Sequence, residues 1–161
     1  MGAPRGDVEA GAQRRVLAAT VGDVRIIDLY VVNGQEVGSE KFEYKLRWLD
    51  KVSEWVGTEL ARHENVVVVG DFNITPDDRD VHDPEAWREK ILCSTPERQA
   101  LRHMLDLGLT DTFRHFEQPG GVYSWWDYRM NQFKRNMGLR IDHILLSASL
   151  AQRAKASVIH K

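Results

Sequence analysis

The spacing of hydrophobic positions changes several times along the chain, and each change predicts a new element. Short apolar runs at Val16–Ala19 and Val24–Tyr30 flank a Gly22-Asp23 turn, a pattern typical of two strands joined as a hairpin. From Glu40 to Arg62, apolar residues recur every three or four positions and predict an amphipathic helix. Residues 1–13 show neither period and are expected to form a loose leader.

The remainder of the chain keeps alternating between strand and helix patterns. Four consecutive valines, Val66–Val69, predict a central strand buried on both faces. A helix is expected from Thr95-Pro96-Glu97 to Gly108, and the alternating segment Leu139–Leu146 predicts a last strand. This succession predicts one α/β domain over residues 14–161, in which ligands should bind beyond the carboxyl ends of the strands.

Composition narrows the class of protein. The 161 residues suffice for one domain with a packed core. Their 22 basic and 24 acidic side chains give a net charge of −2, which excludes a protein held to nucleic acid by bulk positive charge alone. The single cysteine, Cys93, cannot form an internal disulfide and points to a reducing, cytoplasmic location. The longest apolar run is far too short to cross a membrane.

Two candidate site segments stand at the ends of predicted strands. Gly70-Asp71-Phe72-Asn73 ends the four-valine strand, and its carboxylate and amide can address one phosphate, one metal ion or one attacking water. The alternative is an ordinary turn in which both side chains bind nearby backbone N–H groups. Tyr30 ends the Val24–Tyr30 strand, and its phenol either acts beside a phosphate or simply reaches water.

Two further segments place polar groups among hydrophobic ones. Asp142 lies within the predicted strand Leu139–Leu146, where a buried carboxylate needs a histidine, arginine or metal partner, or forms a structural salt bridge. The aromatic segment that contains Trp125 and Arg129, with Asn136 behind it, suits a groove for a sugar-phosphate backbone. The alternative is that these aromatic rings pack in a core.

Five segments occur in one order at compatible distances: Leu29-Tyr30-Val31-Val32-Asn33-Gly34, Val69-Gly70-Asp71-Phe72-Asn73-Ile74-Thr75-Pro76, Asp111-Thr112-Phe113-Arg114, Ser124-Trp125-Trp126-Asp127-Tyr128-Arg129 and Gly138-Leu139-Arg140-Ile141-Asp142. This arrangement resembles the exonuclease III family of bacterial apurinic/apyrimidinic endonucleases, within the endonuclease/exonuclease/phosphatase superfamily. The likeness extends from about Arg14 to Ile159. The Gly-Asp-x-Asn element is common to the superfamily, whereas the last two segments are typical of its DNA-repair branch.

The resemblance implies a fold and an activity. The implied fold is a four-layer α/β sandwich of two mixed sheets, here incomplete. The implied activity is that of a Mg²⁺-dependent, or alternatively Mn²⁺-dependent, DNA phosphodiesterase of base excision repair. Its implied substrates are abasic sites and 3′ ends of double-stranded DNA, cleaved as a 3′-to-5′ exonuclease, an abasic-site endonuclease and a 3′-phosphatase.

The resemblance also assigns roles residue by residue. Tyr30 matches the active-site tyrosine near the scissile phosphate. Asp71 matches the aspartate that activates the attacking water near the metal, and Asn73 the amide that holds phosphate and metal. Asp142 matches the aspartate that orients the catalytic histidine, and Trp125 the aromatic wall of an abasic pocket. The residues expected to contact DNA are Trp125, Arg129 and Asn136.

The chain departs from the family pattern at both ends. The family's N-terminal half, with its Mg²⁺-binding glutamate, and its C-terminal Ser-Asp-His segment have no counterpart in these 161 residues, so a partial domain is expected. Two alternatives stay open: a catalytically inactive DNA-binding fragment, and a superfamily phosphodiesterase for another phosphate ester. The complete enzyme is expected to be a monomer, without a membrane partner.

Overall fold

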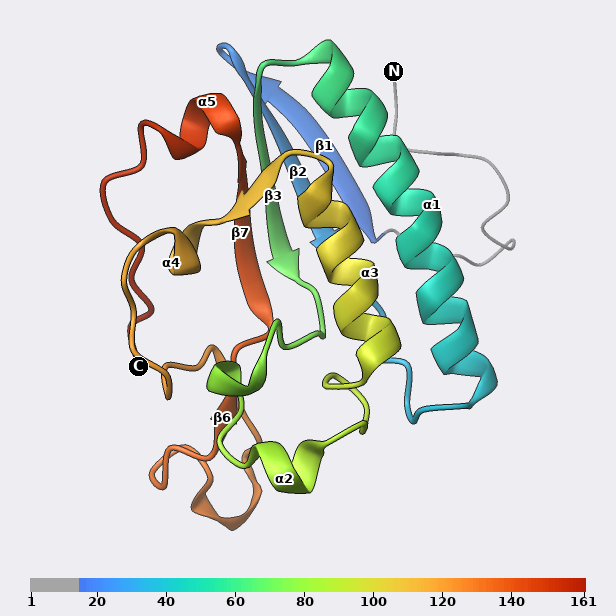
Figure 1. Cartoon of the computed structure of the whole chain (residues 1–161), viewed down its shortest axis with the longest axis vertical. Helices are drawn as coiled ribbons and strands as arrows, with labels where there is room; N and C mark the ends of the chain where they lie inside the picture. The colour runs from blue at the N-terminus through green and yellow to red at the C-terminus, as the bar shows by residue number, and fades with distance from the viewer. Residues whose placement is uncertain (1–14) are drawn as a thin grey trace.

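Five strands form one mixed sheet with two long helices packed on one of its faces, as the computed structural model of residues 15–161 shows (Figure 1). The leader expected at residues 1–13 lies outside the described residues. The strand order is β1-β2-β3-β7-β4, so β3 is central as predicted. The strands are β1 (Val16–Val21), β2 (Val24–Tyr30), β3 (Asn65–Asp71), β4 (Leu109–Asp111) and β7 (Asp142–Ser147).

The strand pairings make the sheet mixed, which agrees with the predicted fold class. β2 and β3 run parallel, and the pairs β1–β2, β3–β7 and β4–β7 run antiparallel. A separate ribbon pairs β5 (Trp125–Trp126) with β6 (Gly138–Leu139). Residues 15–161 hold one large sheet, so the second sheet of the expected sandwich is not among the described elements.

Short helices and 3₁₀ turns complete the described chain, and the two long helices cover the sheet. The helices are α1 (Glu40–Arg62), α2 (Pro84–Trp87), α3 (Thr95–Asp106), α4 (Thr112–His115) and α5 (Ala148–Ala151), and the 3₁₀ turns are η1 (Asp78–Asp80) and η2 (Arg129–Asn131). In Figure 1, α1 and α3 lie side by side on the same side of the sheet. Among the described residues, no helix combines the length and apolar character that a membrane span requires.

Both long helices begin where they were predicted, and each has a side-chain cap at its N-terminus. The Ser39 hydroxyl accepts a hydrogen bond from the Phe42 N–H at 3.1 Å and caps α1. Ser94 and Glu97 form a reciprocal capping box at the start of α3, where proline occupies the first turn. The helix predicted over Glu40–Arg62 and the helix predicted from Thr95 are therefore confirmed.

The main core lies between the sheet and the two helices. Val66 and Val68 of β3 are fully buried there, together with Val52 and Val56 of α1. Val67 and Val69 point to the other side of the sheet and are only partly buried, so the predicted burial of Val66–Val69 on both faces is wrong. The reason is that α1 and α3 cover a single face of the sheet.

We call the side opposite α1 and α3 the open face. Its apolar part is formed by Leu17, Ile26, Val67, Val69 and Ile144, which alternate with buried residues along their strands. Leu17 is 69% exposed and Ile144 is 49% exposed. Ile144 lies on the inner strand β7 and Leu17 on the edge strand β1, and such exposure of large aliphatic side chains gives the open face the character of an uncovered layer.

The strand predicted over Leu139–Leu146 is interrupted. β6 pairs with β5, and β7 begins only at Asp142. Between the two strands, the Ile141 and Asp142 N–H groups both donate to the Ser124 hydroxyl at 3.0 Å instead of to a neighbouring strand. The backbone thus leaves the small ribbon and enters the large sheet, a change of partner that alternation of residue types cannot reveal.

Candidate active site

Tyr30, Asp71 and Asp142 lie side by side on the open face, at the ends of three adjacent strands. Tyr30 is paired with Asp71 between β2 and β3, and Asp71 is paired with Asp142 between β3 and β7. Residues paired between neighbouring strands point to the same face of a sheet, and in an antiparallel pair such as Asp71 and Asp142 their Cβ atoms lie about 4.5–5.5 Å apart. The sheet therefore brings together three predicted catalytic residues from distant parts of the sequence, and we call them the paired row.

Gly70 allows β3 to present Asp71 at this position. Its φ of +137° is open only to glycine, and a Cβ at this residue would lie 1.9 Å from the Leu29 carbonyl oxygen. The adjacent strand therefore approaches more closely than any side chain would permit. The glycine of the Gly-Asp-x-Asn motif therefore allows the close backbone contact beside the Asp71 carboxylate.

Asn73 turns back toward Asp71 immediately after the strand. Its N–H donates to the Asp71 Oδ1 at 2.9 Å, and its backbone adopts the left-handed region, with φ of 49°. The Asn73 side-chain Nδ2 donates to the Val31 carbonyl oxygen at 2.8 Å, which leaves Asn73 Oδ1 as an acceptor. One Asp71 oxygen therefore forms the ordinary turn considered above, while the other Asp71 oxygen and the Asn73 amide oxygen remain for a ligand.

The Asp142 carboxylate acts on the Asp71 carboxylate. Burial raises the pKa of Asp71, the neighbouring Asp142 carboxylate raises it further, and the Asn73 N–H and the Lys45 charge oppose the rise. The pKa of Asp142 is also raised, because the surrounding protein removes part of the water around this exposed residue. Within residues 15–161, neither carboxylate belongs to an ion pair. A cation beside both groups would relieve this repulsion.

Two residues of the paired row and the adjacent Asn73 supply some of the oxygen ligands that a hard divalent cation needs. Mg²⁺ prefers oxygen ligands and retains several waters, and Asp71, Asp142 and Asn73 supply two carboxylates and one amide oxygen. In the described part of the chain, however, no three histidine, cysteine or acidic side chains are grouped so that they could hold a metal ion. These residues therefore offer some of the oxygen ligands that a divalent cation needs, but not a full set.

The environment predicted for Asp142 is wrong. It is the first residue of β7 and is exposed to solvent, whereas the prediction placed it inside a strand with a buried partner. Its hydrogen-bond partner is the Ser124 hydroxyl, and neither a histidine nor an arginine pairs with it. Arg140 and His143, its neighbours in the sequence, lie on the buried side of the chain instead and bind each other.

Ser124 also connects the aromatic segment to the paired row. Trp125 follows Ser124 directly and is 39% exposed, so its ring is available at the same end of the sheet as Asp142. The Arg129 guanidinium makes a two-pronged ion pair with Asp127 at 2.7 and 3.0 Å. That Trp125 forms one wall of an abasic pocket and that Arg129 contacts DNA both stay predictions.

Asn136 has a structural task in this segment. Its Oδ1 accepts a hydrogen bond from the Trp126 Nε1 at 3.3 Å, and its Nδ2 donates to the Gly121 carbonyl oxygen at 3.1 Å. The Asn136 amide therefore links two turns of residues 121–136, which we call the aromatic loop. Its predicted contact with DNA stays a prediction, and sequence reasoning missed this tie because it depends on the folded path of the loop.

A buried network behind the row was not predicted. The Arg140 guanidinium is fully buried and binds Asp80 at 2.7 Å, Asp111 at 2.8 Å and the His143 Nδ1 at 3.3 Å. Burial would raise the pKa of Asp111, but the hydrogen bonds and charge of Arg140 hold it below its usual range. Burial and Arg140 lower the pKa of His143 to about 4, and its Nε2 lies 2.8 Å from the Ile74 carbonyl oxygen.

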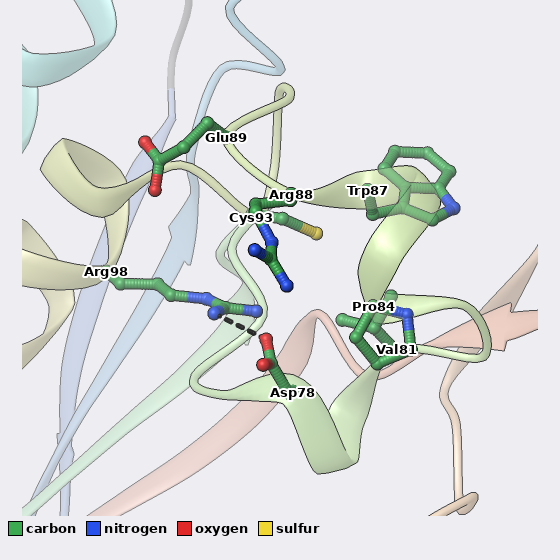
Figure 2. A pocket seen from close by; sticks show the side chains of 8 residues that line it. All are labelled: Asp78, Val81, Pro84, Trp87, Arg88, Glu89, Cys93 and Arg98. Atoms are coloured by element: carbon green, nitrogen blue, oxygen red, sulfur yellow. Dashed lines mark hydrogen bonds and ion pairs between the residues drawn. The ribbon is translucent and has the colours of Figure 1, made fainter.

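A pocket of about 200 Å³ lies away from the row, beside α2 (Figure 2). It is lined by Asp78, Val81, Pro84, Trp87, Arg88, Glu89, Cys93 and Arg98. The two arginines are already paired, Arg98 with Asp78 at 2.9 Å and Arg88 with Glu85. Burial raises the pKa of the Cys93 thiol, which makes it a poor nucleophile. This pocket contains none of the predicted site residues.

Known proteins are similar to this chain in sequence and in fold. The model of the Endonuclease/Exonuclease/phosphatase family matches residues 5–161. An exodeoxyribonuclease of Bacillus subtilis (strain 168) is 31% identical over 152 residues, which cover 94% of this chain and 60% of that protein. The chain thus spans less than two thirds of the length of this curated relative.

Solved structures agree with the sequence comparison. A 3′ phosphatase from Neisseria, bound to product DNA hairpin, is 51% identical with a TM-score of 0.86, and the match covers 88% of this chain and 55% of that one. An AP endonuclease from Archaeoglobus fulgidus is 30% identical with a TM-score of 0.80, covering 86% of this chain and 54% of that one. The paired row, the mixed sheet and these similarities together lead to one conclusion: the chain belongs to the endonuclease/exonuclease/phosphatase family.

Proposed function

We propose that this chain carries part of the active site of a Mg²⁺-dependent DNA phosphodiesterase of base excision repair, which acts at abasic sites and at 3′ ends. The observation that supports this most is the paired row, since Tyr30, Asp71 and Asp142 form one surface at the ends of three strands. Relatives named as a 3′ phosphatase and an AP endonuclease support the choice of DNA as substrate.

Each member of the site has a chemical task in this proposal. The Asp71 carboxylate accepts the proton of the attacking water, since only one of its oxygens is engaged by the Asn73 N–H. The Asn73 amide and the Tyr30 phenol bind the oxygens of the scissile phosphate. A Mg²⁺ ion beside Asp71, Asn73 and Asp142, or Mn²⁺ in its place, would neutralise charge that develops on the phosphate.

The aromatic loop supplies the proposed DNA contacts. Trp125 is partly exposed next to Ser124, and Tyr128 and Met130 project from the same loop with 91% and 76% exposure. Exposed rings beside arginine and lysine side chains suit stacking on an extrahelical sugar or base. The free, buried Cys93 agrees with the reducing cytoplasm as the proposed location.

A second candidate function is DNA binding without cleavage. It is favoured by one observation, namely that the described residues do not group three acidic, histidine or cysteine ligands for a metal. The aromatic loop could still hold DNA in such a protein. The two candidates differ only in whether a bond is broken, so a cleavage assay separates them.

The test uses the purified chain in millimolar Mg²⁺ with three substrates: an abasic-site duplex, a hairpin ending in a 3′-phosphate, and an inositol phosphate. Once the metal site is complete, we expect EDTA-sensitive cleavage of DNA alone, with a single-turnover rate that falls about 100-fold in Asp71→Asn, because general-base catalysis supplies about 10²–10⁴. The control is Asp50→Asn on the exposed side of α1. DNA binding without cleavage would establish the second candidate, and cleavage of the inositol phosphate alone would contradict both.

A further inference from the structure

A fully buried lysine lies directly behind the candidate site. Lys45 of α1 has no exposed surface, and it forms an ion pair with Glu97 of α3, which is equally buried. Complete burial of lysine is rare because its charge loses hydration. Lys45 nevertheless stands in phase with Phe42 and Leu49, so the sequence places a cation on the stripe of α1 that faces the sheet.

The Lys45 ammonium binds both loops that carry site residues. Its Nζ donates to the Asn73 carbonyl oxygen at 2.7 Å and to the Asn33 carbonyl oxygen at 3.1 Å. Asn33 belongs to the loop that follows Tyr30, and Asn73 is itself a site residue. An ammonium has three donors, and here the third binds Glu97, so none is left over.

Glu97 determines where the ammonium lies. Besides Lys45, its carboxylate accepts hydrogen bonds from the Ser94 hydroxyl at 2.5 Å, the Ser94 N–H at 3.2 Å and the Leu92 N–H at 3.0 Å. The carboxylate is therefore held by the capping box of α3. On its other side the lysine stem passes Gly34, where a Cβ would lie 3.0 Å from the Lys45 Cδ.

The backbone of Asn73 needs such support. A left-handed φ of 49° is uncommon for a residue other than glycine, and asparagine adopts it more readily than most because its side chain can hydrogen-bond locally. Three hydrogen bonds hold it there, from its N–H to Asp71, from its Nδ2 to Val31, and from Lys45 to its carbonyl oxygen. The bond from Lys45 is the charged one, and it alone links Asn73 to the helix layer.

We propose that Lys45 is a positioning residue for the candidate active site, which holds the Asn73 amide and the Tyr30 loop in one relative arrangement through its bonds to two backbone carbonyls. The catalytic meaning of this inference rests on the proposed function, whereas its geometric part does not. A purely stabilising pair is the competing explanation, although a buried ion pair is seldom more stable than the apolar residues that could replace it.

Three variants separate position from stability. Glu97→Gln keeps the lysine and an acceptor for the capping box. Lys45→Met combined with Glu97→Gln removes the lysine as well, without leaving a charge unpaired. The matched control is Arg25→Met combined with Glu59→Gln, which removes a partly buried ion pair between β2 and α1, formed at 3.1 Å near the opposite end of the helix.

The first readout is the NMR signals of the Asn73 backbone and side-chain amides, and the second is the single-turnover cleavage rate. We expect wild-type Asn73 signals and a rate within threefold for the control, and smaller changes in Glu97→Gln than in the double variant, because Glu97→Gln keeps the lysine. In Lys45→Met/Glu97→Gln the Asn73 signals should shift and the rate should fall about 10–100-fold, with the Kd for DNA changed less than threefold, because small displacements of site groups slow chemistry. Equal signals and equal rates in Glu97→Gln and the double variant would overturn the proposal.

Two further outcomes are also decisive. If the double variant does not fold, the test is made on the Lys45 ammonium of the wild-type chain by NMR. Slow hydrogen exchange of this ammonium, with NMR contacts to residues 33 and 73, supports the proposal. Rapid exchange without these contacts contradicts it. If the wild-type chain cleaves no DNA, the proposed function fails, while the Asn73 signals still test Lys45. The failures of the two proposals are therefore distinguishable.

Discussion

The two sides of β7 show how strongly neighbouring residues can differ. Asp142 is exposed in the paired row, and His143, the next residue, is buried against Phe72, with ring centroids 5.4 Å apart. Alternation along a strand explains why the two residues point to opposite faces. The sequence could not predict that Arg140 binds His143, because this contact depends on where Asp80 and Asp111 lie in the fold.

The buried His143 should make stability depend on pH. Its pKa is lowered from 6.5 to about 4, so the unfolded chain binds the proton first as the pH falls. The stabilisation is complete above about pH 6.5 and is lost between pH 6.5 and 4, which corresponds to about 3 kcal/mol. Urea unfolding at a series of pH values should show this slope, and His143→Gln should reduce it.

A matched variant tests whether the slope belongs to His143. His103 lies on the exposed side of α3, and His103→Gln should keep the wild-type dependence on pH. An unchanged slope in His143→Gln would contradict the assignment.

Trp125 should affect one DNA substrate more than another. A rigid ring that walls an abasic pocket matters for an extrahelical sugar and little for a terminal phosphate. Trp125→Ala should therefore lower the rate of abasic-site incision at least tenfold more than the rate of 3′-phosphate removal, measured in parallel on matched duplexes. Equal losses on both substrates would show that the ring only packs against its own loop.

At the scale of elements, one arginine joins segments that are far apart in the sequence. Arg140 binds Asp80 of η1 and Asp111 of β4, and Arg114 of α4 also binds Asp80 at 2.7 Å. These ion pairs hold η1, and with it the loop after Asn73, against the sheet. The network replaces the hydrogen bonds that a continuous strand would have formed at Arg140.

Removing Arg140 should therefore destabilise the fold severely. Arg140→Met leaves the partly buried Asp111 carboxylate without its ion-pair partner and the buried Asp80 carboxylate with Arg114 alone, and we expect a loss of about 3–5 kcal/mol in the free energy of unfolding. The control is Arg79→Met, which breaks an exposed ion pair with Asp77 and should cost less than about 1 kcal/mol. Urea denaturation of both variants provides the measurement, and similar losses in the two would contradict the role of the network.

Elements with a local signal were predictable, and those defined by distant partners were not. The spacing of apolar residues and the caps at Ser39 and Ser94 are local, so α1 and α3 were predicted correctly. The Gly-Asp-x-Asn and Arg-Ile-Asp segments located the paired row by resemblance. The break between β6 and β7 was missed because it is caused by the hydroxyl of Ser124, a residue distant in the sequence.

At the scale of the whole molecule, the open face should govern association. It presents Leu17 and Ile144 to solvent beside partly buried valines of β3. We expect the chain to self-associate at micromolar concentrations, and Ile144→Lys should shift it toward the monomer in sedimentation velocity. Val158→Lys, at an exposed apolar residue outside the sheet, is the control and should have no effect. A monomeric wild-type chain would contradict this expectation.

The register of the paired row also determines when the site can exist during synthesis. Tyr30 and Asp71 come together only after α1 has crossed between β2 and β3, and Asp142 joins them only when β7 inserts beside β3. Pairings between such distant segments form late, because the chain loses loop entropy before the contacts are made. A nascent chain that has folded only its first hairpin and α1 therefore carries no assembled row, and the row forms only once β7 has been made and has paired with β3.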